Sequence, residues 1–198
     1  MPAAKRISKE AIIDAAAAVL RIGGFEAINA RSVAKALGCS TQPIYLSFRN
    51  MEELKSALTQ RAIEQHTQRV RESLRAHEGC DSRYSSYGMG FVQFAAQEKQ
   101  LFRWLYLEDN QPGRHQEDVL EPEIIRTVMD EFGYDEVTAR AFHRDMTYYS
   151  YGLAILANTG HLALTETELR EAFRREFRAL AAYYGPPKKL PEFAEREN

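Results

Sequence analysis

Hydrogen-bonding side chains gather in one short stretch of the chain, between residues 40 and 49. When the start of a helix enters the major groove of DNA, Gln can form a bidentate pair with adenine, and Thr can bond a base edge or touch a thymine methyl. We therefore predict Thr41 and Gln42 as base-reading residues. Tyr45 and Ser47 are expected on the same outward side of this helix.

Two short helices joined by a turn must hold these side chains in place. Small or apolar residues at positions 30, 33, 34 and 37 give the first helix a buried face, and Asn29 precedes it as a cap. Gly38 can adopt the left-handed conformation that ends a helix. Ser40 is expected to cap the second helix by accepting the N–H of Gln42, because Pro43 has none. This arrangement predicts a helix-turn-helix.

Charge is distributed unevenly along the 198 residues. The first 50 residues hold seven Lys or Arg and three acidic residues, a net +4, although the whole chain carries −2. The remainder must then carry −6. A basic first segment fits a contact with DNA phosphates confined to one end of the protein, while an ordinary solvated surface is the alternative interpretation.

The stretch from Asn29 to Leu54 resembles the N-terminal domain of TetR-family transcriptional repressors. The likeness runs through Asn-Ala-Arg-Ser-Val-Ala-Lys-Ala-Leu-Gly-Cys-Ser-Thr-Gln-Pro-Ile-Tyr, and upstream through an apolar stripe at 12, 13, 16, 19 and 20 that ends in Gly-Gly-Phe. It implies an all-α fold in which a three-helix DNA-binding domain precedes a larger helical domain for ligand binding and dimerisation.

The resemblance also implies that Tyr45 bonds a phosphate and that Arg31 lies near the DNA backbone. Met51 stands where many members have a lysine, and Lys55, one turn later, is the expected substitute. The expected DNA contacts are Lys5, Arg6, Arg31, Ser40, Thr41, Gln42, Tyr45, Ser47, Arg49 and Lys55.

The remaining sequence divides into helices and one tail. Residues 1–50 are expected as the DNA-binding domain, 51–187 as the regulatory domain and 188–198 as a mobile tail. We predict one long helix from Asn50 to about residue 78, helices at about 82–97 and 99–109, and a loop at 111–113. Further helices are predicted from near Pro122 to Gly133, from Asp135 to about 159, and from a capping box at Thr165 to Gly185.

The last two predicted helices have apolar faces that suit a dimer. Packed against their copies, they would form a two-fold four-helix bundle, although both faces could instead be buried within one chain. The expected interface residues are Tyr149, Gly152, Leu153, Leu156, Phe173, Phe177 and Leu180.

Aromatic side chains crowd the middle of the sequence. Most aromatic stripes at helical spacing form core, yet cavities lined by aromatic and a few polar groups are the usual form of a small-molecule site. The candidates for an effector pocket are Tyr87, Phe91, Phe94, Phe102, Trp104, Tyr106, Met129 and Tyr148, with Trp104 the first choice.

Several other kinds of chemistry find no support in the sequence. The five histidines show no metal-binding spacing, His77 and Cys80 being the nearest approach, and no nucleophile elbow or phosphate-binding glycine loop occurs. We expect no metal and no cofactor. Two cysteines, no long apolar run and no signal peptide favour a cytoplasmic protein.

These patterns together predict a ligand-responsive repressor that binds a palindromic DNA operator as a homodimer and is released by a small-molecule effector. The long helix that begins at Asn50 is expected to carry the signal. Two alternatives remain: a DNA-binding regulator controlled by a protein partner, and an all-helical enzyme.

Overall fold

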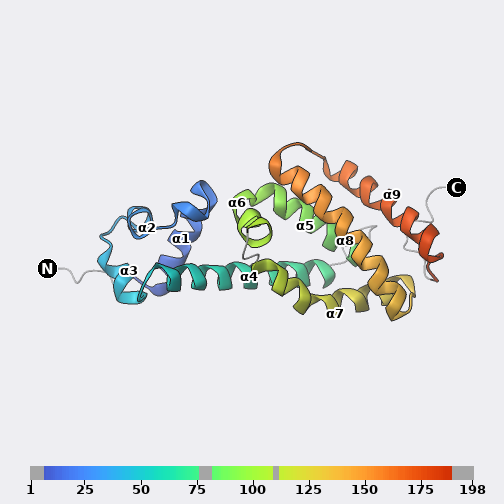
Figure 1. Ribbon diagram of the computed structural model, residues 1–198, viewed down its shortest axis with the longest axis horizontal. Coiled ribbons are helices and arrows are strands. Elements are labelled where there is room, and N and C mark those ends of the chain that lie inside the picture. Colours follow the sequence, from blue (N-terminus) through green and yellow to red (C-terminus); the bar gives the residue numbers. More distant parts are fainter. Residues whose placement is uncertain (1–6, 76–81, 109–111, 189–198) are drawn as a thin grey trace. The chain divides into compact units, whose positions relative to one another are not determined.

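The computed structural model describes residues 7–75, 82–108 and 112–188, and these are helical throughout apart from turns and short connections (Figure 1). The elements in order are α1 (Lys9–Gly23), a 3-10 turn η1 (Phe25–Ala27), α2 (Ala30–Leu37), α3 (Gln42–Ser47), α4 (Met51–Arg75), α5 (Arg83–Gln97), α6 (Lys99–Phe102), a π-helical turn η2 (Arg103–Leu107), α7 (Pro112–Phe132), α8 (Glu136–Thr159) and α9 (Glu166–Tyr184). The predicted all-α fold is confirmed.

The contacts divide the chain into two compact units. Unit 1 comprises Met1–Gln65 with Glu98–Arg114, and unit 2 comprises His66–Gln97 with His115–Asn198. The boundary therefore lies inside α4, whereas the sequence analysis placed a domain boundary at residue 50. Unit 1 also includes α6 and η2, which are far from the N-terminal helices in sequence.

Local signals place the N-terminal helices of unit 1. Asn29 caps α2 by accepting the N–H groups of Arg31 and Ser32 at 3.1 and 3.0 Å, and the Ser32 hydroxyl accepts the Asn29 N–H in return. Gly38 ends α2 with a φ of 66°, in the left-handed region. Both predictions are confirmed.

The predicted start of α3 is wrong in one detail. Thr41, not Ser40, directly precedes this helix, and its backbone is already in the helical region with a φ of −74° and a ψ of −13°. No side chain caps the helix; the Thr41 carbonyl instead accepts the N–H of Ile44 at 3.1 Å. A residue with helical dihedrals cannot aim its side chain back as a cap usually does, so backbone bonding replaces it.

The predicted loop at 111–113 and the helix start near Pro122 are also wrong where the structure describes them. Helix α7 begins at Pro112, and Pro122 lies inside the helix. Proline is well suited to a first helical position, because the N–H it lacks would have no intrahelical partner there. Pro112 and Pro122 could each occupy a first helical position, and the helix begins at Pro112. Gln111 lies outside the described residues.

Unit 2 is built around α5, which packs on α8 and α9 (Figure 1). A Cβ added at Gly88 of α5 would stand 2.8 Å from the Phe173 ring of α9, so this close approach requires glycine. The rings of Phe132, Phe142 and Phe177 complete the core, with centroids 4.9–5.8 Å apart.

Both ends of α5 are tied to neighbouring helices of unit 2. The Glu131 carboxylate of α7 accepts the backbone N–H groups of Arg83 and Tyr84 at 2.9 and 3.1 Å. At the other end, the amide of Asn158, 1% exposed, donates to the Ala95 carbonyl at 2.9 Å. These bonds satisfy groups that a helix end leaves without intrahelical partners.

The remaining helix boundaries of unit 2 follow the sequence. Asp135 caps α8 by accepting the Thr138 N–H, and Gly160 ends it in the left-handed region. Thr165 and Glu168 form the predicted capping box of α9. Residues 189–198, most of the predicted tail, lie outside the described residues.

Candidate functional site

Helix α3 presents one solvent-exposed face in unit 1. Gln42, Tyr45 and Leu46, spaced three and four residues apart, all point to solvent, with Tyr45 55% and Leu46 79% exposed. Thr41 and Ser47 are half-buried, and Ser40 is exposed. The predicted base-reading residues therefore lie at the accessible N-terminal end of the second helix.

The opposite face of α3 anchors it in the core of unit 1. Ile44 is 1% and Phe48 is 2% exposed. The Lys9 ammonium of α1 lies 4.6 Å from the centroid of the Phe48 ring, which adds a cation–π contact. A helix of six residues is too short to be stable alone, so this packing supplies its rigidity.

Leu46 is a surface residue that the sequence analysis did not select. An isolated leucine in a short helix looks like a core residue, and only the packing of α3 shows that it points outward. On a helix that enters the major groove, an apolar side chain can contact a thymine methyl.

Arg49 and the start of α4 are joined through one carboxylate. Glu53 accepts the Arg49 backbone N–H at 2.9 Å and its Nε at 3.1 Å, and Asn50 accepts the Glu53 N–H at 2.9 Å. The bonds from Arg49 lower the pKa of the Glu53 carboxyl. Arg49 itself remains 90% exposed, so its guanidinium is held beside α3 and still open to a phosphate.

The remaining predicted DNA contacts divide into three groups. Arg31 is exposed on α2. Lys5 and Arg6 lie outside the described residues. The Lys55 ammonium, however, lies 4.4 Å from the centroid of the Phe25 ring and 3.7 Å from a Glu52 oxygen, and its side chain is only 21% exposed.

Phe25 joins the N-terminal helices to the π-helical turn of unit 1. Its ring stacks on Trp104 of η2 with centroids 5.2 Å apart, and Trp104 is 5% exposed. Close by in sequence, Glu98 accepts a hydrogen bond from Arg21 of α1 at 3.0 Å. Trp104 therefore stabilises unit 1.

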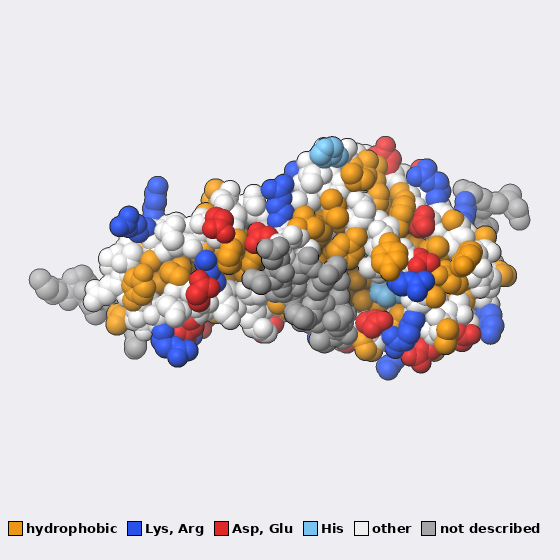
Figure 2. All heavy atoms as spheres, in the orientation of Figure 1, with side chains coloured by type: hydrophobic (Ala, Val, Ile, Leu, Met, Phe, Trp, Pro, Cys, Tyr) orange, Lys and Arg blue, Asp and Glu red, His pale blue; other side chains and the backbone are white. Residues whose placement is uncertain are grey.

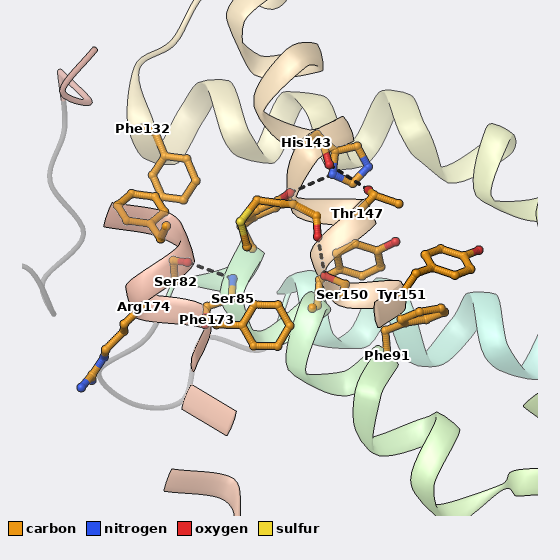
Figure 3. Close-up of a pocket in the computed structure, with 15 residues that line it drawn as sticks. Ser82, Ser85, Phe91, Phe132, His143, Thr147, Ser150, Tyr151, Phe173 and Arg174 are labelled. Carbon is orange, nitrogen blue, oxygen red and sulfur yellow. Dashed lines mark hydrogen bonds between the residues drawn. The ribbon is translucent and has the colours of Figure 1, made fainter. Parts of the chain in front are cut away.

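A second candidate site is an aromatic cavity inside unit 2 (Figure 3). Side chains from α5, α7, α8 and α9 line it, together with Ser82 just before α5. The lining residues are Ser82, Tyr84, Ser85, Tyr87, Gly88, Phe91, Phe132, His143, Met146, Thr147, Ser150, Tyr151, Phe173, Arg174 and Phe177. Figure 3 shows the Arg174 guanidinium directed away from the other labelled side chains.

The cavity contains one buried titratable pair. The Tyr84 hydroxyl and His143 Nδ1 lie 2.8 Å apart. Burial lowers the pKa of His143 to about 4 and raises the pKa of Tyr84 well above its ordinary value. Both groups are therefore neutral at pH 7, which a site without an ion partner favours.

Two of the predicted pocket residues, Tyr87 and Phe91, line this cavity, and six do not. Phe102, Trp104 and Tyr106 belong to unit 1. Phe94 instead faces a second hollow of unit 2, described below, and Tyr148 is 67% exposed. Met129 is half-buried on α7 and lines neither hollow. Trp104, the first choice, lies in unit 1 and lines neither hollow of unit 2.

The predicted dimer residues also separate by exposure. Tyr149, whose hydroxyl donates to the Ala172 carbonyl, and the buried Phe173 and Phe177 belong to the interior of unit 2. Gly152 and Leu156 are exposed, while Leu153 and Leu180 are half-buried. Figure 2 shows hydrophobic side chains reaching the surface over α8 and α9. Exposed Tyr148, Ile155 and Tyr183 extend this set.

Metal and membrane sites were searched across the described residues. They contain no group of three or more His, Cys, Asp or Glu side chains able to hold a metal ion. His77 and Cys80 lie outside them. None of the described helices combines the length and apolar character needed to cross a membrane.

Comparison with known protein families finds a match for the N-terminal helices. Residues 12–58 match the sequence model of the bacterial regulatory proteins of the tetR family. These residues cover α2 and α3, most of α1 and the start of α4. No match was found among curated proteins.

Solved structures share the fold at low sequence identity. A protein described as a transcriptional regulator from Pseudomonas aeruginosa PAO1 has a TM-score of 0.64 at 15% identity, over 88% of this chain and 90% of that one. A TetR-family regulator from Mesorhizobium loti MAFF303099 gives 0.61 at 14%, over 88% and 95%. FadR from Bacillus subtilis, solved in complex with stearoyl-CoA, gives 0.53 at 15%, over 87% and 97%. Residues 12–58 therefore carry the N-terminal domain of the bacterial regulatory proteins of the tetR family, and the chain as a whole shares the fold of these solved structures.

Proposed function

We propose that this regulator is a ligand-responsive repressor, which binds a palindromic operator as a homodimer and leaves it when a small molecule occupies unit 2. The exposed face of α3, held rigidly by Ile44 and Phe48, carries the proposal. Such a face fits the major groove, where the first residues of the recognition helix read base edges.

Each polar residue around α3 has a distinct proposed role. Gln42 and Thr41 read bases, with Leu46 available to a thymine methyl. Tyr45, Arg31 and Arg49 contact phosphates, as do Ser40, Ser47 and the N-terminal Lys5 and Arg6. Phosphate contacts position the protein on any duplex, whereas base contacts select the sequence.

Homodimerisation is supported by an exposed apolar stripe on α8 and α9. Tyr148, Gly152, Ile155 and Leu156 share one face of α8, and Ala179, Ala182 and Tyr183 are exposed on α9. Two such helix pairs related by a two-fold axis would bury this stripe in a four-helix bundle. Two DNA-reading units one helical turn apart would then match a palindrome.

Ligand control is supported by the cavity and by the path of the chain. The chain passes between the units at three places: after Gln65, after Gln97 and after Arg114. A ligand that displaces α4 or α5 in unit 2 can therefore act on unit 1 through continuous backbone. Linkage then requires that DNA weaken ligand binding by the same factor. FadR of Bacillus subtilis, solved with stearoyl-CoA, is a neighbour of this fold that holds a small ligand.

Selection of bound sequences from a random DNA pool tests the DNA-binding proposal. We expect a palindrome with half-sites about 34 Å apart, one helical turn. On that operator, Gln42→Ala should cost about 1–3 kcal/mol at one base pair only, while Tyr45→Phe should weaken binding to all sequences alike. Failure to enrich any sequence at low salt would contradict the proposal, and equal losses for Gln42→Ala on cognate and scrambled DNA would remove its assigned role.

Gly152→Arg tests the dimer surface. Gly152 is exposed, and a Cβ there would meet no atom within 4 Å, so the folded chain tolerates the change. In the proposed interface the same side chain would bury an unpaired charge, and we expect the dimer dissociation constant to rise about tenfold or more by sedimentation analysis. Ala163→Arg, exposed between α8 and α9, is the matched control. Equal dimer stability in both variants would place the interface elsewhere.

A further inference from the structure

Two hollows in unit 2 share a wall. The inner one is the aromatic cavity, which has only about 30 Å³ of open space, room for one water molecule. The outer one, a groove of about 360 Å³ between α4 and α5, is lined by His66, Arg69, Val70, Glu72, Tyr87, Gly90, Phe91, Gln93, Phe94 and Gln97. Tyr87 and Phe91 line both hollows.

This shared wall consists of the rings of Tyr87 and Phe91. Tyr87 is half-buried, and its ring lies 6.4 Å from Tyr84 and 6.3 Å from His143 between centroids. Phe91 packs on Tyr151 with centroids 5.0 Å apart. Rotation of the Tyr87 side chain would join the two hollows into one space of drug-ligand size, about 300–1,000 Å³.

Apart from Arg174, the lining of the inner cavity has no side chain that is charged at pH 7. No carboxylate is among its lining residues, and the guanidinium of Arg174 points away (Figure 3). The hydroxyls of Thr147 and Ser150 already donate to carbonyls of their own helix, at 2.8 Å each. An ion entering this space would lose its hydration without a charge partner, so an uncharged aromatic ring is favoured.

The pair of Tyr84 and His143 offers a single donor hydrogen. A neutral imidazole has one N–H and a neutral phenol has one O–H, and one of the two is used in their 2.8 Å bond. The other remains for a ligand, whichever tautomer the imidazole adopts. A carbonyl or ether oxygen is therefore the complementary group.

The outer groove has the opposite character. Arg69, Glu72, Gln93 and Gln97 supply charged and amide groups at its edge, while the rings of His66 and Phe94, with centroids 4.6 Å apart, form an aromatic patch. A polar substituent would remain hydrated or hydrogen-bonded there.

We propose that the two hollows are chambers of one effector site, separated by Tyr87 and Phe91, for an uncharged aromatic molecule with an acceptor oxygen at its buried end and a polar substituent at the other. The acceptor takes the hydrogen offered by Tyr84 and His143. This inference rests on the proposed ligand control and adds the chemical class of the effector.

Three naphthalenes of similar size test the proposal by calorimetry on the full chain without DNA. 2-Acetylnaphthalene should bind at least about tenfold more tightly than 2-naphthoate, which is anionic at pH 7.5. It should also bind more tightly than 2-ethylnaphthalene, by about threefold to tenfold, because only the ketone accepts a hydrogen bond. Preference for the anion, no preference between ketone and hydrocarbon, or no binding of any probe would overturn it.

Variants locate the effect in the cavity. The double variant Tyr84→Phe/His143→Phe removes both donor hydrogens and should abolish the preference for the ketone over the hydrocarbon, whereas His161→Phe, at an exposed position, should preserve it. His143→Gln keeps a donor and should retain the preference, which keeps the proposal testable if the double variant destabilises the fold. Tyr87→Ala should tighten binding of a 2-acetylnaphthalene extended at position 6 by a hydroxyethoxy group, about threefold or more, since the wall no longer has to move.

The outcome separates this inference from the proposed function. A chain that selects a palindromic operator but shows no preference for the neutral probe refutes the ligand class alone. A chain that binds 2-acetylnaphthalene and selects no DNA refutes the proposed repressor and leaves the chemistry of the cavity intact.

Discussion

The two candidate sites of this protein are built in opposite ways. In unit 1, the exposed residues of α3 all lie between Gln42 and Leu46, are polar in majority and are open to solvent. In unit 2, the cavity is enclosed by side chains from α5, α7, α8 and α9, is mainly aromatic and has Arg174, whose guanidinium is directed away, as the one charged residue of its lining. A surface that must approach a polyanion benefits from exposed polar groups, whereas a small ligand is bound most tightly where water is excluded.

The largest expected difference in binding between the two units comes from weakening the packing of α3 in the core of unit 1. Ile44→Ala should destabilise unit 1 by about 2–4 kcal/mol, because the site is completely buried. DNA binding should fall sharply while the ligand affinity of unit 2 in the absence of DNA stays unchanged, as measured by chemical unfolding and by calorimetry. Leu46→Ala, exposed on the same helix, should change stability by no more than about 0.5 kcal/mol. Comparable unfolding in both variants would contradict the described packing of α3.

Acidification should lower the stability of unit 2 more than that of unit 1. Burial lowers the pKa of His66 and of His143 to about 4 from 6.5, and both belong to unit 2, whereas the sequence of unit 1 contains no histidine. Between pH 6.5 and 4 the unfolded chain binds protons that the folded chain excludes, so stability is complete above pH 6.5 and is lost as the pH falls. We expect a loss of about 3 kcal/mol per histidine across this window, from a difference of about 2.5 pKa units.

His143→Gln provides the control for this pH effect. Unfolding of the variant, followed by circular dichroism across the same window, should show a smaller loss on acidification than the parent chain. An equal loss in both would assign the effect to other groups, because glutamine does not titrate.

The smallest expected effect concerns Lys55. Its ammonium is engaged by Phe25 and Glu52, so Lys55→Ala should leave the salt dependence of DNA binding unchanged and cost about 0.5–1 kcal/mol of stability. A salt slope lowered by about one would instead establish the phosphate contact expected from the sequence. Arg49→Ala is the matched comparison, with the lower slope expected.

The sequence predicted those features that depend on a few neighbouring residues. Asn29, Gly38, Asp135 and Thr165 each act through backbone groups within four positions, and each is found in its predicted role. Ser40 failed by one position, because the backbone of Thr41 is already helical. A shift of one position in the start of a helix leaves the spacing of apolar residues unchanged, so the sequence does not reveal it.

Features that depend on distant packing could not be read in this way. Trp104 and Phe91 are both aromatic and only thirteen positions apart, yet the first stacks on Phe25 in unit 1 and the second lines the cavity of unit 2. The separation arises because the chain returns to unit 1 after Gln97. No local pattern marks that return, so the pocket could be predicted as a type of site but not residue by residue.

The bonds at the two ends of α5 have a mechanical consequence. Glu131 accepts the first N–H groups of α5, and Asn158 donates to the Ala95 carbonyl near its last turn, so both ends of the helix are held by hydrogen bonds. A ligand that presses on the middle of α5, where Tyr87 and Phe91 lie, can bend the helix little. Its effect is therefore passed to the hydrogen bonds at the two helix ends or along the helix axis. The residue after Gln97 is Glu98, which is bonded to Arg21 of α1. We therefore expect the ion pair of Glu98 and Arg21 to be one route by which a displacement inside unit 2 reaches the first helix of unit 1.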